Sequence, residues 1–128
     1  MKNKWSKHWK SSKQRRKQRK YVANAPLHIR KKLFSTSLSK ELRKKHNLRN
    51  IPLVKGDRVK VMRGQFKKHI GKVESKDYKK VRIYIEGINA VKKDGTKKFI
   101  PIHPSNVIIT ELNLDDKRRK EILERKRK

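Results

Sequence analysis

Residues 55–73 read KGDRVKVMRGQFKKHIGKV, and this stretch indicates the kind of fold. Valines alternate with basic residues over 58–61, which is the pattern of a strand with one buried face. Glycines at 64 and 71 bound a basic loop, and Val73 lies in a second short strand. Glycine permits positive φ and close backbone approach, so this loop can present amide groups as well as cations to phosphates. The stretch predicts a small β module that offers a loop to nucleic acid.

The charge of the chain supports the same partner. Of 128 residues, 41 are Lys or Arg and 11 are Asp or Glu, which gives a net charge of +30 and a pI of about 11.0. Such a chain is attracted to any polyphosphate at modest salt. We expect no membrane association, because the sequence lacks a bilayer-length apolar run, a wide apolar face on a basic helix and a lipidation signal.

Charge also divides the chain into three segments. Residues 1–50 hold 18 basic residues and one acid, residues 51–112 hold 15 and six, and residues 113–128 hold eight and four. Only 32% of the residues are apolar, so part of the chain lacks the means to form a core. We interpret 1–50 as a basic N-terminal extension with short helices, 51–112 as the β module and 113–128 as a C-terminal basic helix.

The first 20 residues are expected to be disordered in isolation, because like charges repel and few apolar groups are present. Two tryptophans four residues apart favour a role beyond solubility, since indole rings stack on unpaired bases while nearby cations contact phosphates. A solvated tail or a nuclear-localisation run is the alternative. The candidate RNA-binding residues here are Lys4, Trp5, Lys7, Trp9, Lys10, Lys13, Arg15, Arg16, Lys17, Arg19 and Lys20.

Two short helices are predicted before residue 50. Pro26 suits the first position of one helix. Ser39 is a suitable N-cap for the other, Glu41 favours its first turn, and Asn47 suits a left-handed C-terminal position. Both helices are too short to be stable alone and need a surface to pack on.

Period-two patterns return beyond residue 51. Residues 81–86, 99–100 and 107–109 read as strands, and Asp94-Gly95 is a tight-turn signal. About five short strands in about 60 residues predict a mainly β fold, a small barrel that is marginally stable alone. The C-terminal helix has only a small apolar patch at residues 122–123 and is expected to be solvated or to lie on RNA.

The stretch 55–73 resembles the KOW motif, which ribosomal proteins and transcription elongation factors share. Four further segments resemble the archaeal and eukaryotic form of one family of large-subunit ribosomal proteins, the universal family numbered twenty-four in bacteria and twenty-six in eukaryotes. They are residues 24–31 (NAPLHIRK), 38–43 (LSKELR), 93–96 (KDGT) and 101–107 (PIHPSNV). The resemblance covers residues 10–125, and residues 113–119 are more similar to archaeal members.

This resemblance implies an SH3-like barrel in the large subunit, bound to the 5′ region of its rRNA near the peptide exit tunnel. It implies a cytoplasmic, ribosomal location, a role in structure and early assembly, neighbouring large-subunit proteins as partners, and neither cofactor nor small-molecule substrate. By position, the residues implied to contact RNA are His28, Arg30, Lys31, Lys32, Arg63, Gly64, Gln65, Lys67, Lys68 and His69. The motif often has glycine where this chain has Lys68, so the loop is expected to turn differently there.

Two other functional classes compete with this interpretation. An enzyme is not favoured, because the chain has no Cys, its five histidines are dispersed and its acids lie mostly at turns or helix starts. We therefore predict neither catalytic nor metal-binding residues, and a turn or packing role for His103. A KOW-type transcription elongation factor is the alternative, but such factors usually carry further domains and often acidic stretches.

Overall fold

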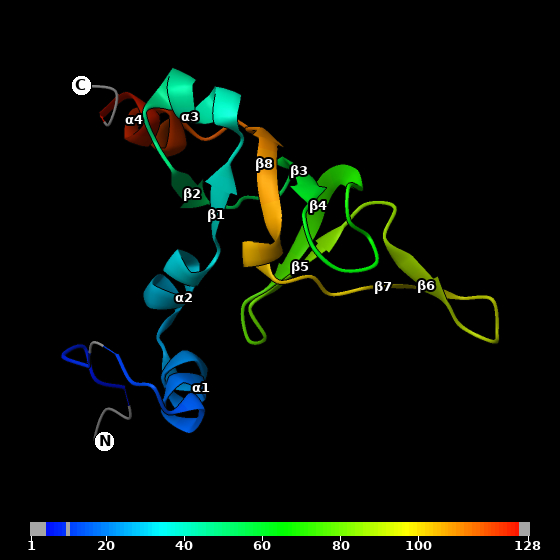
Figure 1. Ribbon diagram of the computed structural model, residues 1–128, viewed down its shortest axis with the longest axis horizontal. Coiled ribbons are helices and arrows are strands. Elements are labelled where there is room, and N and C mark those ends of the chain that lie inside the picture. Colours follow the sequence, from blue (N-terminus) through cyan, green and yellow to red (C-terminus); the bar gives the residue numbers. More distant parts are fainter. Residues whose placement is uncertain (1–4, 10, 126–128) are drawn as a thin grey trace.

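The computed structural model describes residues 5–9 and 11–125 (Figure 1). These residues contain four α-helices, eight strands and one 3₁₀ turn. In chain order they are α1 Arg15–Asn24, α2 Leu27–Leu33, β1 Ser35–Leu38, α3 Lys40–His46, β2 Asn50–Pro52, β3 Arg58–Val61, β4 Ile70–Asp77, β5 Arg82–Ile85, β6 Asn89–Val91, β7 Lys97–Phe99, η1 Pro104–Asn106, β8 Val107–Glu111 and α4 Lys117–Arg125.

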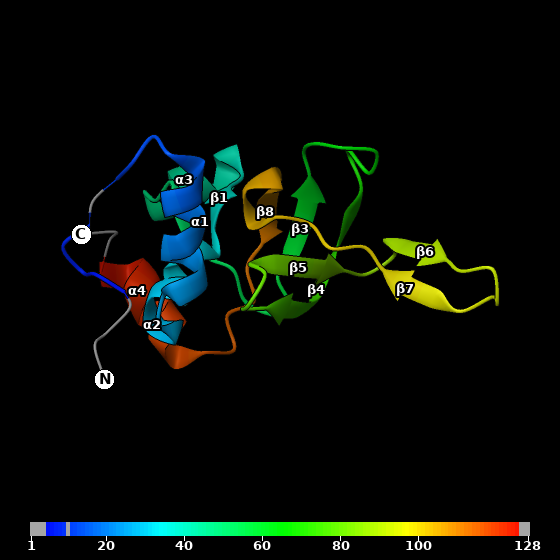
Figure 2. The same ribbon diagram turned by 90° about the horizontal axis from the view of Figure 1, so that it is seen from below.

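The main sheet has six strands in the order β2-β1-β8-β3-β4-β5. Every neighbouring pair is antiparallel except β1 and β8, which are parallel. Strands β6 and β7 form a separate hairpin that projects from one end of the molecule, opposite to α1 (Figures 1 and 2). The expected mainly β class is confirmed. A closed barrel is not confirmed, because the hydrogen-bonded order ends at β2 and β5, and a single bridge joins Ile83 of β5 to Ile102.

Strand β1 was not predicted, since it lies in the segment where only helices were expected. Its short sequence, STSL, alternates half-buried and buried residues, with Thr36 and Leu38 facing inward. The buried Thr36 hydroxyl has carbonyl partners at Phe34 and Pro104, 3.3 and 3.2 Å away. Satisfying this hydroxyl removes most of the cost of burying it, so a polar strand can lie inside the sheet.

Both predicted ends of α3 are confirmed, whereas Pro26 was expected at the first helical position of α2 and is its N-cap instead. Ser39 is the N-cap of α3, and its Oγ accepts a hydrogen bond from the Leu42 amide at 3.4 Å. Asn47 ends that helix in the left-handed conformation with φ of 50°. Pro26 directly precedes α2. The Asp94-Gly95 turn joins β6 to β7, and Gly95 has φ of +86°.

The core lies between the inner face of the sheet and the segments that cover it. Alternating residues of the strands supply most of it, and α4 adds one side chain. Its buried members are Phe34, Leu38, Ile51, Leu53, Val59, Val61, Val73, Val81, Ile83, Ile85, Ile88, Ile102, Val107, Ile109 and Leu123.

The C-terminal helix packs on the core through Arg119 and Leu123, so the expectation of a wholly solvated helix is wrong, and contact of its exposed face with RNA stays a prediction. Leu123 and Arg119 are each only 4% exposed. Arg119 donates through Nη1 and Nη2 to the two carboxylate oxygens of Asp57, at 2.6 and 2.8 Å. Asp57 is fully buried and also accepts from the amides of Val54 and Asn113, both at 2.8 Å. This bidentate buried ion pair joins α4 to the start of β3, and the two backbone amides add further donors to its carboxylate.

The N-terminal region also differs from expectation, because residues 15–20 are helical as the first part of α1. Arg, Lys and Gln have high helix propensity, so the sequence RRKQRK favours a helix despite its charge. Val22 of α1 packs against the core and anchors the helix. The connection to α2 is closed by Arg30, which donates to the carbonyls of Ala23, Ala25 (2.9 Å) and Tyr78 (3.2 Å).

His103 caps the 3₁₀ turn η1, in agreement with the predicted turn role. Its Nδ1 accepts from the Ser105 amide at 3.2 Å and lies 2.7 Å from the Ser105 Oγ. Burial, with a further contribution from the Arg82 charge, holds the pKa of His103 below its usual value of 6.5. The neutral ring is therefore the form that the fold favours.

This arrangement predicts a loss of stability in mild acid. The unfolded chain binds a proton at His103 near pH 6.5, whereas the folded chain binds it only at lower pH. The free energy of unfolding should thus fall as the pH is lowered from 7 toward the folded pKa and level off below it. Urea denaturation between pH 7 and 5 checks this. His103→Asn, which keeps an acceptor for the cap, should flatten the profile; an unchanged profile would contradict the assignment.

Candidate nucleic-acid interface

The loop between β3 and β4, residues 62–69, is ordered by its own backbone. The Lys68 amide donates to the Val61 carbonyl at 2.8 Å, and the His69 amide donates to the Phe66 carbonyl at 3.0 Å. Gly64 has φ of +87°, and the space around its α-carbon is open. The Phe66 ring packs against the core, so one side of the loop is anchored and the other is turned to solvent.

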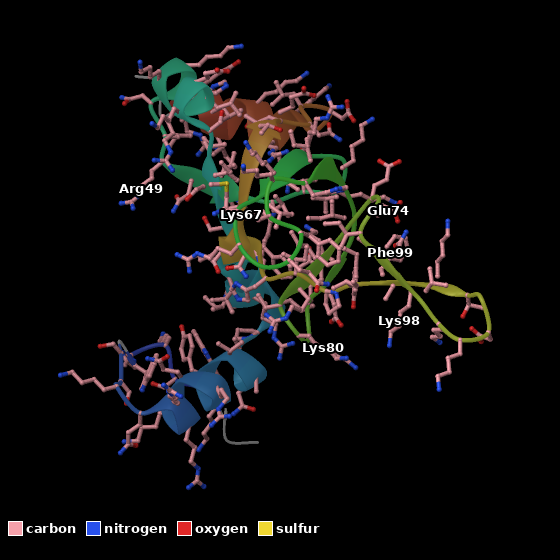
Figure 3. The ribbon with its side chains drawn as sticks, turned by 45° about the vertical axis from the view of Figure 1, so that its right-hand side comes forward. Arg49, Lys67, Glu74, Lys80, Lys98 and Phe99 are labelled. Carbon is pink, nitrogen blue, oxygen red and sulfur yellow. The ribbon has the colours of Figure 1, made fainter. Side chains whose placement is uncertain are left out.

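The cations of this loop face outward. Arg63, Lys67 and Lys68 are exposed, and within the described part of the chain their side chains have no hydrogen bond or ion pair. Lys67 is labelled on this loop in Figure 3. Gln65 is also exposed. Together with the free space at Gly64, these side chains form a basic surface that a phosphate chain can approach.

His69, by contrast, has a structural contact. Its Nε2 lies 3.1 Å from the Glu86 carbonyl oxygen, and its ring lies against Gly87. A Cβ added to Gly71 would lie 2.7 Å from the same carbonyl and 2.8 Å from Ile85 Cγ2. Glycine is thus required at 71 by close packing and favoured at 64 by its positive φ, and the His69 ring links the loop to the segment after β5.

Lys68 adopts φ of +73°, the left-handed conformation that glycine tolerates and L residues with side chains disfavour. The loop was expected to turn differently here because the KOW motif often has glycine at this position. The φ angle of Lys68 does not show that difference, since it is one that glycine adopts readily. Lys68→Gly should raise the free energy of unfolding by about 0.5–1 kcal/mol through relief of this strain. It should also weaken RNA binding by about threefold at 0.2 M salt, because one cation is removed from this basic surface.

Urea denaturation and a salt titration of RNA binding measure the two effects separately. Lys67→Gln serves as the matched control, since Lys67 is not among the residues with positive φ. That control should lose affinity without gaining stability. Equal stabilities of Lys68→Gly and the wild type would show that the lysine is not strained.

The two tryptophans lie against helix α1. The ring centroids of Trp9 and Tyr21 are 4.6 Å apart and stacked, and those of Trp5 and Tyr21 are 5.3 Å apart and tilted. Lys7 and Lys13 are exposed, while Lys4 and Lys10 lie outside the described residues. The rings are half-buried by one another, so stacking on an RNA base would use their remaining open surface.

Helix α1 carries the densest positive charge, and no acid is present along it. Its five cationic side chains are exposed, and none has a hydrogen bond or ion pair among the described residues. The positive charges on this helix repel one another until bound anions neutralise them. These side chains are Arg15, Arg16, Lys17, Arg19 and Lys20.

The basic residues of helix α2 have two different roles: one is held by hydrogen bonds within the protein, and the others are exposed to solvent. Arg30 is held by the three carbonyls described above, so its guanidinium serves the junction of α1 and α2. His28, Lys31 and Lys32 are exposed. Of this predicted group, these three are the side chains open to a ligand.

One basic element was missed by the sequence reasoning. The β6–β7 hairpin carries exposed lysines at 92, 93, 97 and 98, on both sides of the Asp94-Gly95 turn. Figure 2 shows this hairpin extending away from the sheet. The signal was present as two lysine pairs beside a turn, but only the turn was interpreted.

The chemistry available to the described residues is that of a cationic surface. Among them no group of three or more His, Asp or Glu side chains could hold a metal ion. No helix within the same residues is long and apolar enough to cross a bilayer. Exposed lysines and arginines bind phosphates, and exposed rings stack on bases.

Comparison with known proteins agrees with these features. The family that matches residues 12–126 is described as ribosomal proteins, L26 in eukaryotes and the corresponding L24 type in archaea. The large ribosomal subunit protein uL24 of Korarchaeum cryptofilum is 54% identical over 110 residues, which cover 86% of this chain and 84% of the relative. The large ribosomal subunit protein uL24 of Methanosphaera stadtmanae is 48% identical over 115 residues, covering 90% and 98%. The chain therefore belongs to the uL24 family of large-subunit ribosomal proteins, which includes the eukaryotic L26 proteins and their archaeal counterparts.

Proposed function

We propose that this protein is a non-enzymatic, structural constituent of the large ribosomal subunit that binds rRNA through α1 and the β3–β4 loop. The observation that carries the proposal is the set of exposed cations, unpaired within the described residues, on these two elements. Membership of the uL24 family supports it. We further propose the 5′ region of the large rRNA near the peptide exit tunnel as the site, neighbouring large-subunit proteins as partners, a cytoplasmic location, and an early role in assembly.

The proposed division of labour follows the three charge segments. Residues 1–50 contribute most of the RNA contacts, residues 51–112 form the SH3-like module of the family, and residues 113–128 complete it. The proposed RNA contacts are the residues inferred from the sequence. Arg30 and His69 are exceptions, because they hold neighbouring segments in place. Tyr21, which packs against both tryptophans, is added as a further aromatic contact.

Affinity in this proposal comes mainly from neutralising phosphates. Lys and Arg release counterions when they contact the RNA backbone, so binding weakens as salt increases. Specificity comes from the shape of the folded RNA and from stacking on unpaired bases. The attachment of α1 through Val22 and Arg30 positions its charges relative to the loop.

Gradient sedimentation of a tagged copy, with sequencing of crosslinked RNA, tests the proposal. We expect the protein to migrate with large subunits at physiological and high salt, with crosslinks in the 5′ part of the large rRNA. Migration with RNA polymerase, or crosslinks scattered over messenger RNAs, would overturn the proposal and favour the KOW-type elongation factor.

A further inference from the structure

A second basic surface lies at the base of the β6–β7 hairpin, away from the β3–β4 loop and α1. It is a groove of about 440 Å³ between the hairpin and the outer face of β5. Residues of β4, the β4–β5 turn, β5 and β7 line it. None of its lining residues was among those proposed above to contact RNA.

Two aromatic rings lie in this groove. Tyr84 is on the outward face of β5, since Ile83 and Ile85 on either side of it are buried in the core. Phe99, at the end of β7, is 40% exposed. The ring centroids are 6.4 Å apart and the planes are inclined at 59°, so the rings contact each other as a tilted pair, which we call the Tyr84–Phe99 wedge, and part of the Phe99 ring stays exposed. An exposed phenylalanine is costly in water, and a flat aromatic ligand would cover it.

The charge around the wedge is positive. Lys80, Arg82 and Lys98 line the groove, and no acidic residue is among its lining residues. In Figure 3, Lys80 and Lys98 lie toward the same side of β7, whereas Glu74 points away from them. The nearby carboxylate of Asp77 is engaged in the β4–β5 turn, where its Oδ1 accepts from the amides of Lys79 (2.9 Å) and Lys80 (3.2 Å).

We propose that this groove binds an unpaired stretch of RNA, with one base stacked on the exposed ring of Phe99 in the Tyr84–Phe99 wedge and adjacent phosphates at Lys80, Arg82 and Lys98. Cations alone would bind any polyanion, but aromatic faces add affinity only for bases that are not stacked in a duplex. The charge of the groove selects a polyanion and its rings select a single strand. The proposal rests on the proposed rRNA-binding function and adds to it a distinct site with a defined ligand class.

The test uses the full-length protein and two RNA probes. One is a non-self-complementary 12-nucleotide single strand and the other is the 12-base-pair duplex of the same sequence, each followed by fluorescence anisotropy over a salt series. Phe99→Ala should weaken single-strand binding by about tenfold and change duplex binding by less than about twofold. Phe99→Trp, which keeps a ring, should restore the single-strand affinity.

Matched controls separate the ring from general apolar and charge effects. Val91→Ala removes an exposed apolar side chain of the same hairpin outside the groove (69% exposed) and should leave both affinities unchanged. Lys98→Gln should lower the salt slope of single-strand binding by about 0.7, and Lys93→Gln, outside the groove, should lower it less. Tyr84→Ala is a second variant that removes a ring. If it does not fold, the test depends on the Phe99 variants, because Phe99 is exposed.

Crosslinking identifies the occupant directly. A single strand with one 4-thiouridine should crosslink to a peptide that contains Tyr84 or Phe99.

Three outcomes would contradict the proposals. If Phe99→Ala binds the single strand as tightly as the wild type does, the groove proposal is wrong. The proposed function would still stand if the protein sediments with large subunits. A Glu-rich peptide that binds the wild type more tightly than the single strand, and loses that affinity in Phe99→Ala, would overturn RNA as the ligand. Failure of the wild type to bind either RNA would count against the proposed function itself.

Discussion

Arg119→Leu is expected to lower the free energy of unfolding by about 3–5 kcal/mol, because it leaves the fully buried Asp57 carboxylate without its cation. The guanidinium also donates to the Asn113 carbonyl at 2.7 Å, so its loss frees the segment before α4 as well. Urea denaturation monitored by circular dichroism measures the change. The large effect follows from burial, since exposed ion pairs contribute about 0–1 kcal/mol.

Arg118→Leu is the matched control for this prediction. Arg118 is next to Arg119 on the same helix, but it is exposed, and its replacement should change stability by less than about 0.5 kcal/mol. A double variant with leucine at both 57 and 119 should be less destabilised than the sum of the single variants, because neither charge is then left unpaired. Equal effects of Arg118→Leu and Arg119→Leu would refute the role of the buried pair.

Neutralising the five cations of α1 is the change with the largest expected effect on binding. Glutamine at positions 15, 16, 17, 19 and 20 should weaken binding to a 5′ large-subunit rRNA fragment by about 10²-fold at 0.2 M salt, with a salt slope smaller by about 3 to 4. Glutamine keeps a high helix propensity, so the helix should persist. Filter binding over a salt series gives both quantities, and circular dichroism confirms the helix.

Removing a similar number of charges from another helix, four rather than five, tests whether position matters. Glutamine at the exposed residues Lys117, Arg118, Lys120 and Arg125 of α4 removes four charges from a helix that is fixed to the sheet. We expect a much smaller loss of affinity from this variant. Comparable losses from both variants would mean that net charge alone, and not the placement of α1, determines binding.

The features predicted correctly from the sequence depend on neighbouring residues. Ser39 and Asn47 bound α3 because a cap and a left-handed residue act over a single turn. Asp94-Gly95 specifies its own hairpin, and the valine alternation at 59 and 61 specifies which face of β3 is buried. Family membership was likewise readable, because it depends on short motifs and their order along the chain.

Other features were decided only when distant segments met. The parallel pairing of β1 with β8 joins Ser37 to Ile108, and the two residues of the Arg119–Asp57 pair are 62 positions apart. The sequence alone predicted disorder up to residue 20, which includes the first part of α1. The helix is held by tertiary contacts instead, through Val22 in the core and Arg30 on the Tyr78 carbonyl. The Tyr84–Phe99 wedge depends on how the hairpin meets β5. Local sequence specifies backbone conformation and periodicity, whereas these contacts depend on the packing of side chains from separate segments, which no local pattern records.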